Sequence, residues 1–155
     1  MAWRISNKNL NSMLDALADN HAGGAILVYE GSQPVNSHAA PTGTLLGMVT
    51  KDAGAWTPGQ PTNGLHFAPA AGRALVKSPT EVWQVKGIAD GTAGWFRFVA
   101  NAADSGALDE TESLPRIDGR CGTSNAEMLM SSLEIRVNAI TTVDAFTLRW
   151  PANVL

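Results

Sequence analysis

The sequence predicts an all-β protein, a jelly-roll-like antiparallel β-sandwich of about eight short strands with one N-terminal helix. Short runs rich in β-branched and aromatic residues recur along the chain, separated by Gly, Pro, Asn and Ser. Helical spacing of apolar residues is convincing only near the N-terminus, and strands do not alternate with helices as they do in a parallel α/β fold. A distorted barrel is the alternative arrangement of the same strands.

Length and composition predict one domain that contacts other subunits. The 155 residues suffice for one hydrophobic core, so we expect a single domain over residues 1–155. Charged residues make up only 16% and apolar residues 45%. This low charge favours a surface that other chains partly cover, as in a dimer or trimer.

Charge and hydropathy argue against nucleic-acid and membrane partners. The net charge of -3 and the lack of a dense Lys/Arg cluster argue against nucleic-acid binding, which needs a basic face. No apolar run approaches the length that crosses a bilayer, so we expect no membrane partner. The single cysteine, Cys121, has no intrachain partner for a disulfide.

The predicted helix spans residues 6–20. Four apolar residues recur there at steps of three and four, on one face: Leu10, Met13, Leu14 and Leu17. Ser6 or Asn7 can cap the start, and Gly23 and Gly24 follow the end, where left-handed backbone is easily adopted. We favour a helix that plugs one open end or face of the sheet over one that binds a partner.

Two apolar runs after the helix predict the first strands, one within residues 23–34 and one within 42–50. Residues 51–63 contain two glycines and two prolines around Trp56 and predict a loop. Trp56 either folds back onto the core, which we favour, or stands out as an interface anchor. Short strands are expected within residues 64–69 and 73–77.

Residues 81–89 and 94–100 give the strongest strand signal. The first segment alternates in polarity, and the second contains Trp95, Phe96 and Phe98. Asp90 and Gly91 lie between them, and Asp-Gly is a favoured hairpin turn because Gly accepts positive φ. We therefore expect these two strands to be antiparallel neighbours.

Residues 101–115 predict a solvated acidic loop. A calcium site there is disfavoured, because the four carboxylates lack the Asp-x-Asp-x-Asp-Gly spacing. The last third returns to strands, with the final pair alternating in polarity at period two. Strands are expected at residues 116–119, 126–130, 133–137 and 145–151, with residues 138–144 as a connection.

The sequence contains no recognisable catalytic motif. His21, His38 and His66 are far apart and have no metal-ligand spacing. Arg120 could lower the pKa of Cys121, but no motif links a histidine to this thiol, so we interpret Cys121 as a small buried turn residue. Phosphate loops and nucleophile elbows are absent. We therefore expect no enzyme activity, no catalytic residues, no cofactor and no metal.

Several short motifs together resemble a family of small structural proteins of tailed bacteriophages. Their order and approximate spacing match over nearly the whole chain, although each motif alone is weak. They are the helix around Met13-Leu14-Asp15-Ala16-Leu17, Gly23-Gly24-x-x-x-x-Tyr29-x-Gly31-x-x-Pro34, Ala39-Ala40-x-Thr42-Gly43-Thr44-Leu45-Leu46, Trp95-Phe96-Arg97 and Gly119-x-x-Gly122-Thr123-Ser124-x-Ala126. The chain departs from the family pattern at residues 53–80 and 101–115.

The resemblance implies a non-enzymatic virion component, assembled in the host cytoplasm. The expected function is a capsid decoration or cement protein that binds the major capsid protein and stabilises the shell. Alternatives are a tail, baseplate or head-to-tail connector subunit, and a carbohydrate-binding virion module. By residue type, the candidate interface residues are Trp3, Trp56 and Trp150.

Overall fold

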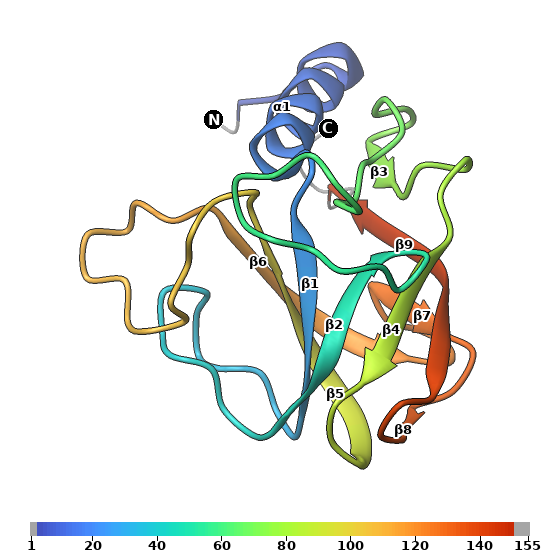
Figure 1. Cartoon of the computed structure of the whole chain (residues 1–155). Helices are drawn as coiled ribbons and strands as arrows, with labels where there is room; N and C mark the ends of the chain where they lie inside the picture. The colour runs from blue at the N-terminus through green and yellow to red at the C-terminus, as the bar shows by residue number, and fades with distance from the viewer. Residues whose placement is uncertain (1–2, 151–155) are drawn as a thin grey trace.

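The computed structural model describes residues 3–150. Within these residues, one helix is followed by nine strands (Figure 1). The elements are α1 (Asn7–His21), β1 (Ala25–Glu30), β2 (Leu45–Lys51), β3 (Ala74–Val76), β4 (Trp83–Gly87), β5 (Gly91–Val99), β6 (Arg116–Gly122), β7 (Met128–Met130), β8 (Glu134–Ile135) and β9 (Ile140–Arg149).

Seven of the strands close into a mixed β-barrel. The hydrogen-bonded order is β1-β2-β4-β9-β7-β6-β5, and β5 pairs with β1 to close the ring. All pairs are antiparallel except β6 with β7. β3 pairs with β9, and β8 pairs with β5. The all-β class with one N-terminal helix is confirmed, whereas a jelly-roll sandwich is not confirmed, because one closed ring takes in the main strands.

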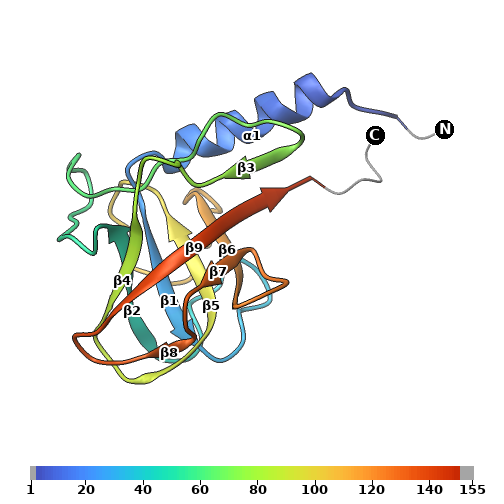
Figure 2. The same ribbon diagram turned by 90° about the vertical axis from the view of Figure 1, so that its right-hand side faces the viewer.

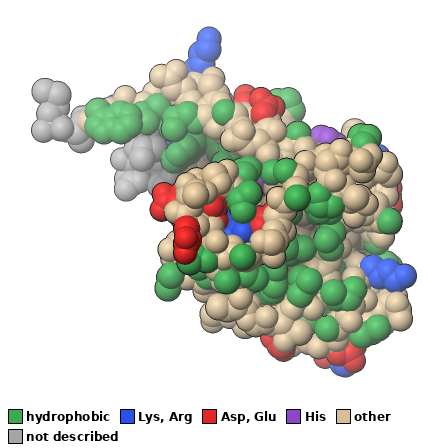
Figure 3. Space-filling view, turned by 60° about the vertical axis from the view of Figure 1, so that its left-hand side comes forward, with side chains coloured by type: hydrophobic (Ala, Val, Ile, Leu, Met, Phe, Trp, Pro, Cys, Tyr) green, Lys and Arg blue, Asp and Glu red, His purple; other side chains and the backbone are tan. Residues whose placement is uncertain are grey.

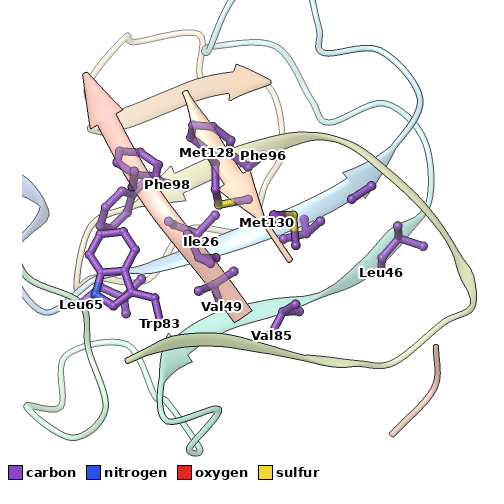
Figure 4. Close-up of a cluster of buried hydrophobic side chains, with 14 of the residues drawn as sticks. Ile26, Leu46, Val49, Leu65, Trp83, Val85, Phe96, Phe98, Met128 and Met130 are labelled. Atoms are coloured by element: carbon purple, nitrogen blue, oxygen red, sulfur yellow. The ribbon is translucent and has the colours of Figure 1, made fainter. Parts of the chain in front are cut away.

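The barrel interior holds the hydrophobic core. Period-two alternation places Ile26, Val28, Phe96 and Phe98 inside, all fully buried. Phe98 contacts four other rings, with centroids between 5.2 and 6.0 Å away. Figure 4 shows Ile26, Trp83, Phe96 and Phe98 converging from different strands. This aromatic packing joins strands that are far apart in the sequence.

Helix α1 lies across one end of the barrel, near β3 (Figures 1 and 2). The Ser6 hydroxyl caps it by accepting a bond from the backbone N–H of Asn9 at 3.3 Å. Gly23 adopts a φ of 75° just after the helix, as the Gly-Gly pair predicts. The helix therefore covers an open barrel end.

The predicted hairpin between the strands around Asp90 and Gly91 is wrong. β4 pairs with β2 and β9, and β5 pairs with β1 and β6. The backbone N–H groups of Ile88 and Ala89 both donate to the carbonyl of Leu46 in β2. The chain thus stays bonded to β2 as it leaves β4, and the turn carries it across the barrel end instead of back along β4.

Other strand boundaries also differ from the prediction. The sequence predicts a connection over residues 138–144, but β9 begins at Ile140 and its first three residues pair with β4. Residues 64–69 form only isolated bridges, at Leu65 and Phe67. The polar residues Thr141 and Thr142 make the start of β9 resemble a loop in the sequence. In the fold they belong to the strand, and Thr141 is buried in the barrel wall.

Candidate functional site

The three candidate interface tryptophans differ in exposure. Trp3 is 81% exposed. Trp56 and Trp150 are half-buried, and their indole N–H groups donate to the carbonyls of Gly23 at 2.8 Å and Leu10 at 3.2 Å. Trp3 and Trp150 lie near α1, whereas Trp56 lies beside β2. The three residues therefore mark two different surfaces.

The first surface, which we call the α1 surface, surrounds an apolar hollow of about 580 Å³. Its lining residues are Trp3, Arg4, Ile5, Asn9, Ser12, Met13 and Ala16. Arg4 is the only charged residue among them. Figure 3 shows hydrophobic side chains gathered along this end of the molecule.

The helix has a wider apolar face than the barrel can cover. Leu10 and Leu14 are buried against the fold, whereas Met13 remains 47% exposed. Met13 also lines a hollow of about 200 Å³ between α1 and β9, together with Leu17, Leu148 and Trp150. Met13 therefore lines both hollows, and it belongs to a group of apolar side chains rather than being an isolated exposed residue.

The second surface, which we call the β2–β4 groove, lies on the outside of the barrel. It has a volume of about 250 Å³, and its lining includes Met48, Trp56, Lys86 and Ile88. Met48 and Lys86 are register partners, and Lys86 is the partner of Ile140 on β9. Ile88 is 61% exposed and Ile140 is 50% exposed, which extends the apolar area beyond the groove.

A buried ionic layer joins the loops to another part of the barrel wall. The guanidinium of Arg97 donates to both oxygens of Asp118, at 2.8 and 2.7 Å. The guanidinium of Arg116 likewise holds the Asp104 carboxylate, with Nε to Oδ2 at 2.7 Å. This hydrogen bond from Arg116 lowers the pKa of Asp104. Figure 3 shows acidic and basic side chains enclosed together on this side.

The ionic layer holds two long loops against the barrel. Arg97 donates to the carbonyl of Ala39, and Arg116 donates to those of His38 and Ala107. The expected solvated acidic loop is exposed at Glu110 and Glu112, whereas the Asp104 and Asp109 side chains are 8% and 4% exposed. Two of the four acidic side chains of this loop are therefore buried instead of facing solvent.

A polar hollow of about 500 Å³ lies beside this layer, and its lining includes Trp95, Asp118, Arg120 and Glu127. Its charged groups are paired, because Arg120 contacts Glu127 at 3.1 Å and Asp118 is held by Arg97. Trp95 is only 1% exposed, and its ring stacks on Tyr29 with a centroid distance of 4.5 Å. The hollow thus offers neither a free charge nor an open aromatic face.

Reactive groups are separated from one another. Burial raises the pKa of the Cys121 thiol to about 12, which leaves almost no thiolate near neutral pH. His66 contacts the Glu81 carboxylate at 2.7 Å, but the same carboxylate also accepts bonds from the Trp83 indole and the His66 backbone, which indicates a structural tie. In residues 3–150, no three His, Cys, Asp or Glu residues gather in a way that could hold a metal.

Sequence reasoning missed the ionic layer and most of the apolar surfaces. Asp104 and Arg116 are 12 positions apart, and Arg97 and Asp118 are 21 apart, with no local spacing rule to connect them. Of the sequence motifs described above, Trp95-Phe96-Arg97 contains one member of the layer, Arg97. Within the described chain, no helix is long and apolar enough to cross a membrane.

These observations define a closed mixed β-barrel with a helix across one end and two apolar outer surfaces. No family model matches the chain, and neither the characterised proteins nor the solved structures searched contain a match.

Proposed function

We propose that this chain is a non-enzymatic structural protein of a tailed-bacteriophage virion, a capsid decoration or cement protein that binds the major capsid protein. The sequence motifs described above suggest the virion, and the two apolar surfaces support a role in assembly. A jelly-roll arrangement is not needed for this role, because the contacts would come from α1 and from the outer face of β2 and β4.

The observation that carries the proposal is the exposure of apolar side chains on two separate parts of the fold. Trp3 at 81% and Ile88 at 61% belong to the α1 surface and the β2–β4 groove, respectively. A cement protein must contact at least two neighbours to hold them together. Two apolar surfaces on one rigid barrel meet this requirement, because each can bury area against a different subunit.

We assign the β2–β4 groove to the shell. Ile88→Glu introduces a charge at the exposed end of the groove and should weaken binding to capsids by roughly tenfold or more, as hot-spot substitutions do. Trp56 is less suitable for this test, because its bond to Gly23 also supports the fold. Val35→Glu is the matched control, since Val35 is 97% exposed and does not line the groove.

The test is co-sedimentation with purified capsids, together with a cryo-electron-microscopy map of the intact particle. Repeated copies on the outside of the shell, and loss of binding for Ile88→Glu alone, are the expected results. Absence of the protein from the particle would refute the virion proposal. Density confined to the tail, baseplate or head-to-tail connector would replace decoration by the alternative virion location.

The exposed ring of Trp3 supports a second candidate, a carbohydrate-binding virion module. Such modules use exposed aromatic rings as platforms for sugars, and Trp3 is the only one of the three candidate tryptophans that is mostly exposed. A glycan array with the unmodified protein and with Trp3→Ser tests this function. Binding that Trp3→Ser removes would support it, and an array without signal would eliminate it.

A further inference from the structure

We propose that the polar hollow beside the ionic layer is a binding site for a neutral sugar. We call it the β5–β6 hollow, because Trp95 on β5 and Asp118 on β6 belong to its lining. Its volume of about 500 Å³ lies within the range of small-ligand pockets, about 300–1,000 Å³. The site is separate from the α1 surface that contains Trp3, and the inference does not rest on the decoration function.

Asp118 presents a buried carboxylate to the hollow. Its side chain is only 6% exposed, and each of its oxygens accepts one hydrogen bond from Arg97, at 2.8 and 2.7 Å. A carboxylate has about four acceptor positions, so the described residues leave about two positions of Asp118 unused. Hydroxyl groups of a ligand can donate to these positions in place of water, whereas an apolar ligand would leave them unpaired at a cost in free energy. The hollow therefore favours a ligand rich in hydroxyl groups.

The pairing of charges argues against an ionic ligand. Arg120 contacts Glu127 at 3.1 Å, and Asp118 is held by Arg97. An anion would compete with Glu127 for Arg120, and a cation would compete with Arg97 for Asp118. Separating the buried pair would leave a charge without its partner, which is strongly unfavourable. A neutral ligand leaves both pairs intact.

Polar groups at the exposed part of the lining can hydrogen-bond to such a ligand. Ser32 and Gln33 are exposed, and their side chains form no hydrogen bond with the described residues. Arg120 uses Nε and Nη2 for Glu127, which leaves Nη1 able to donate elsewhere. A hydroxyl, an amide and a guanidinium N–H together complement sugar hydroxyl groups, because these both donate and accept.

Three glycines keep the β5–β6 hollow open: Gly31, Gly94 and Gly119. A Cβ at Gly31, where φ is 87°, would meet no atom within 4 Å. A Cβ at Gly94 would collide with the carbonyl oxygen of Gly31, so the main chain after β1 approaches β5 closely only because Gly94 has no side chain. Part of the wall is therefore bare main chain, which a ligand can approach closely.

The experiment follows the amide signals of the isotope-labelled full chain by nuclear magnetic resonance. The probes are maltose, cellobiose and N,N′-diacetylchitobiose, each titrated to millimolar concentrations. The backbone N–H groups of Gly31, Gly94 and Gly119 and the side-chain amide of Gln33 report on the hollow. We expect at least one sugar to shift these signals in a saturable manner. Sodium sulfate, an anionic probe added at matched ionic strength, should leave them unchanged.

Two variants test the assignment of the site. Gln33→Ala should weaken sugar binding about fivefold, because it removes neutral hydrogen bonds to the ligand. Gln60→Ala is the matched control, since Gln60 is also exposed but does not line the hollow. Ser32→Phe should abolish binding by filling the hollow from an exposed position. Circular dichroism checks the fold of each variant, and Gln33→Ala decides the test if Ser32→Phe does not fold.

Three results would overturn the inference. The first is the absence of saturable shifts at the three glycines with every sugar, or a response to sulfate larger than the response to sugars. The second is equal weakening by Gln33→Ala and Gln60→Ala. The third is a sugar response that Trp3→Ser removes and Gln33→Ala leaves unchanged, which would place the sugar on the α1 surface.

The same variants separate this inference from the proposed function. Gln33→Ala should bind capsids normally, and Ile88→Glu should respond to sugars normally. Saturable sugar binding without capsid binding would support the β5–β6 hollow and refute the decoration function. Capsid binding without any sugar response would refute the sugar site and leave the decoration function standing.

Discussion

His21 illustrates how a single buried polar side chain is accommodated at the junction of helix and barrel. Its side chain is almost fully buried, Nδ1 donates to the carbonyl of Leu17 at 3.0 Å, and its ring packs edge-on against Phe98. Nε2 has no hydrogen-bond partner among the described residues. Burial lowers the pKa of His21 because the charged ring would lose its hydration. The fold therefore holds this imidazole in its neutral form.

We predict that His21 makes the protein less stable under mildly acidic conditions. The pKa of His21 is lowered in the folded state, so its contribution is fully present above the unfolded value of 6.5. That contribution is lost as the pH falls below 6.5, because the unfolded chain then binds the proton more readily. Urea unfolding at about pH 8 and about pH 5.5 should show this loss, since most carboxylates titrate below this range.

His21→Gln should reduce the pH dependence of the unfolding free energy between these two values, whatever its effect on absolute stability. His66→Gln is the control, because His66 is exposed at the surface. An unchanged pH dependence in His21→Gln, or a dependence that disappears in His66→Gln, would contradict the assignment.

At the scale of elements, the ionic layer explains how loops without regular structure keep a defined position. Residues 101–115 contain no helix or strand, yet Asp104 bonds to Arg116 at the start of β6, and Asp109 accepts the backbone N–H of Leu114. Arg116 also reaches the loop that follows β1, through the carbonyl of His38. One arginine on a strand thus fixes two loops that are distant in the sequence.

We predict that Asp104→Ala lowers the free energy of unfolding by about 3 kcal/mol, because it leaves the buried Arg116 guanidinium without its carboxylate. The Arg116 side chain is only 1% exposed, so water cannot readily replace the lost partner. Glu110→Ala removes an exposed acid from the same loop and should change stability by less than about 0.5 kcal/mol. Chemical denaturation of both variants makes the comparison, and equal losses would argue against the ionic anchor.

At the scale of the whole molecule, barrel closure makes the strands depend on one another. β1 pairs with both β2 and β5, so separating it opens the ring and exposes the aromatic core. Cys121 lies on β6 and packs partly against this core. Its half-buried thiol therefore reports on the opening of the barrel as a unit.

We predict that Cys121 reacts with an alkylating reagent only in unfolded molecules, because its pKa of about 12 in the fold leaves little thiolate. Labelling measured against urea concentration should have the same midpoint as the circular dichroism transition. Val35→Cys adds an exposed thiol that should be labelled without denaturant, which shows that the reagent is active. Labelling of Cys121 well before the loss of circular dichroism would indicate independent opening of β6.

The local features of this protein follow from its sequence alone. Period-two alternation identified most of the strands, and helical spacing with Ser6 and the Gly23-Gly24 pair identified α1. These features depend on residues that are close together in the chain, so local propensity and polarity are enough to predict them. Residue type also predicts Trp3 as a candidate contact, because tryptophan is enriched at binding hot spots.

Strand order, barrel closure and the identity of the surfaces depend instead on contacts between distant parts of the chain. Asp90-Gly91 is a favourable turn sequence. β4 and β5 nevertheless do not pair with each other, because each is hydrogen-bonded to other strands of the barrel. Likewise, no local pattern reveals that Asp104 is internal or that Met13 faces outward beside Trp3. The physical reason is that these properties depend on which distant segments compete to cover each residue, and this competition is settled only when the ring closes.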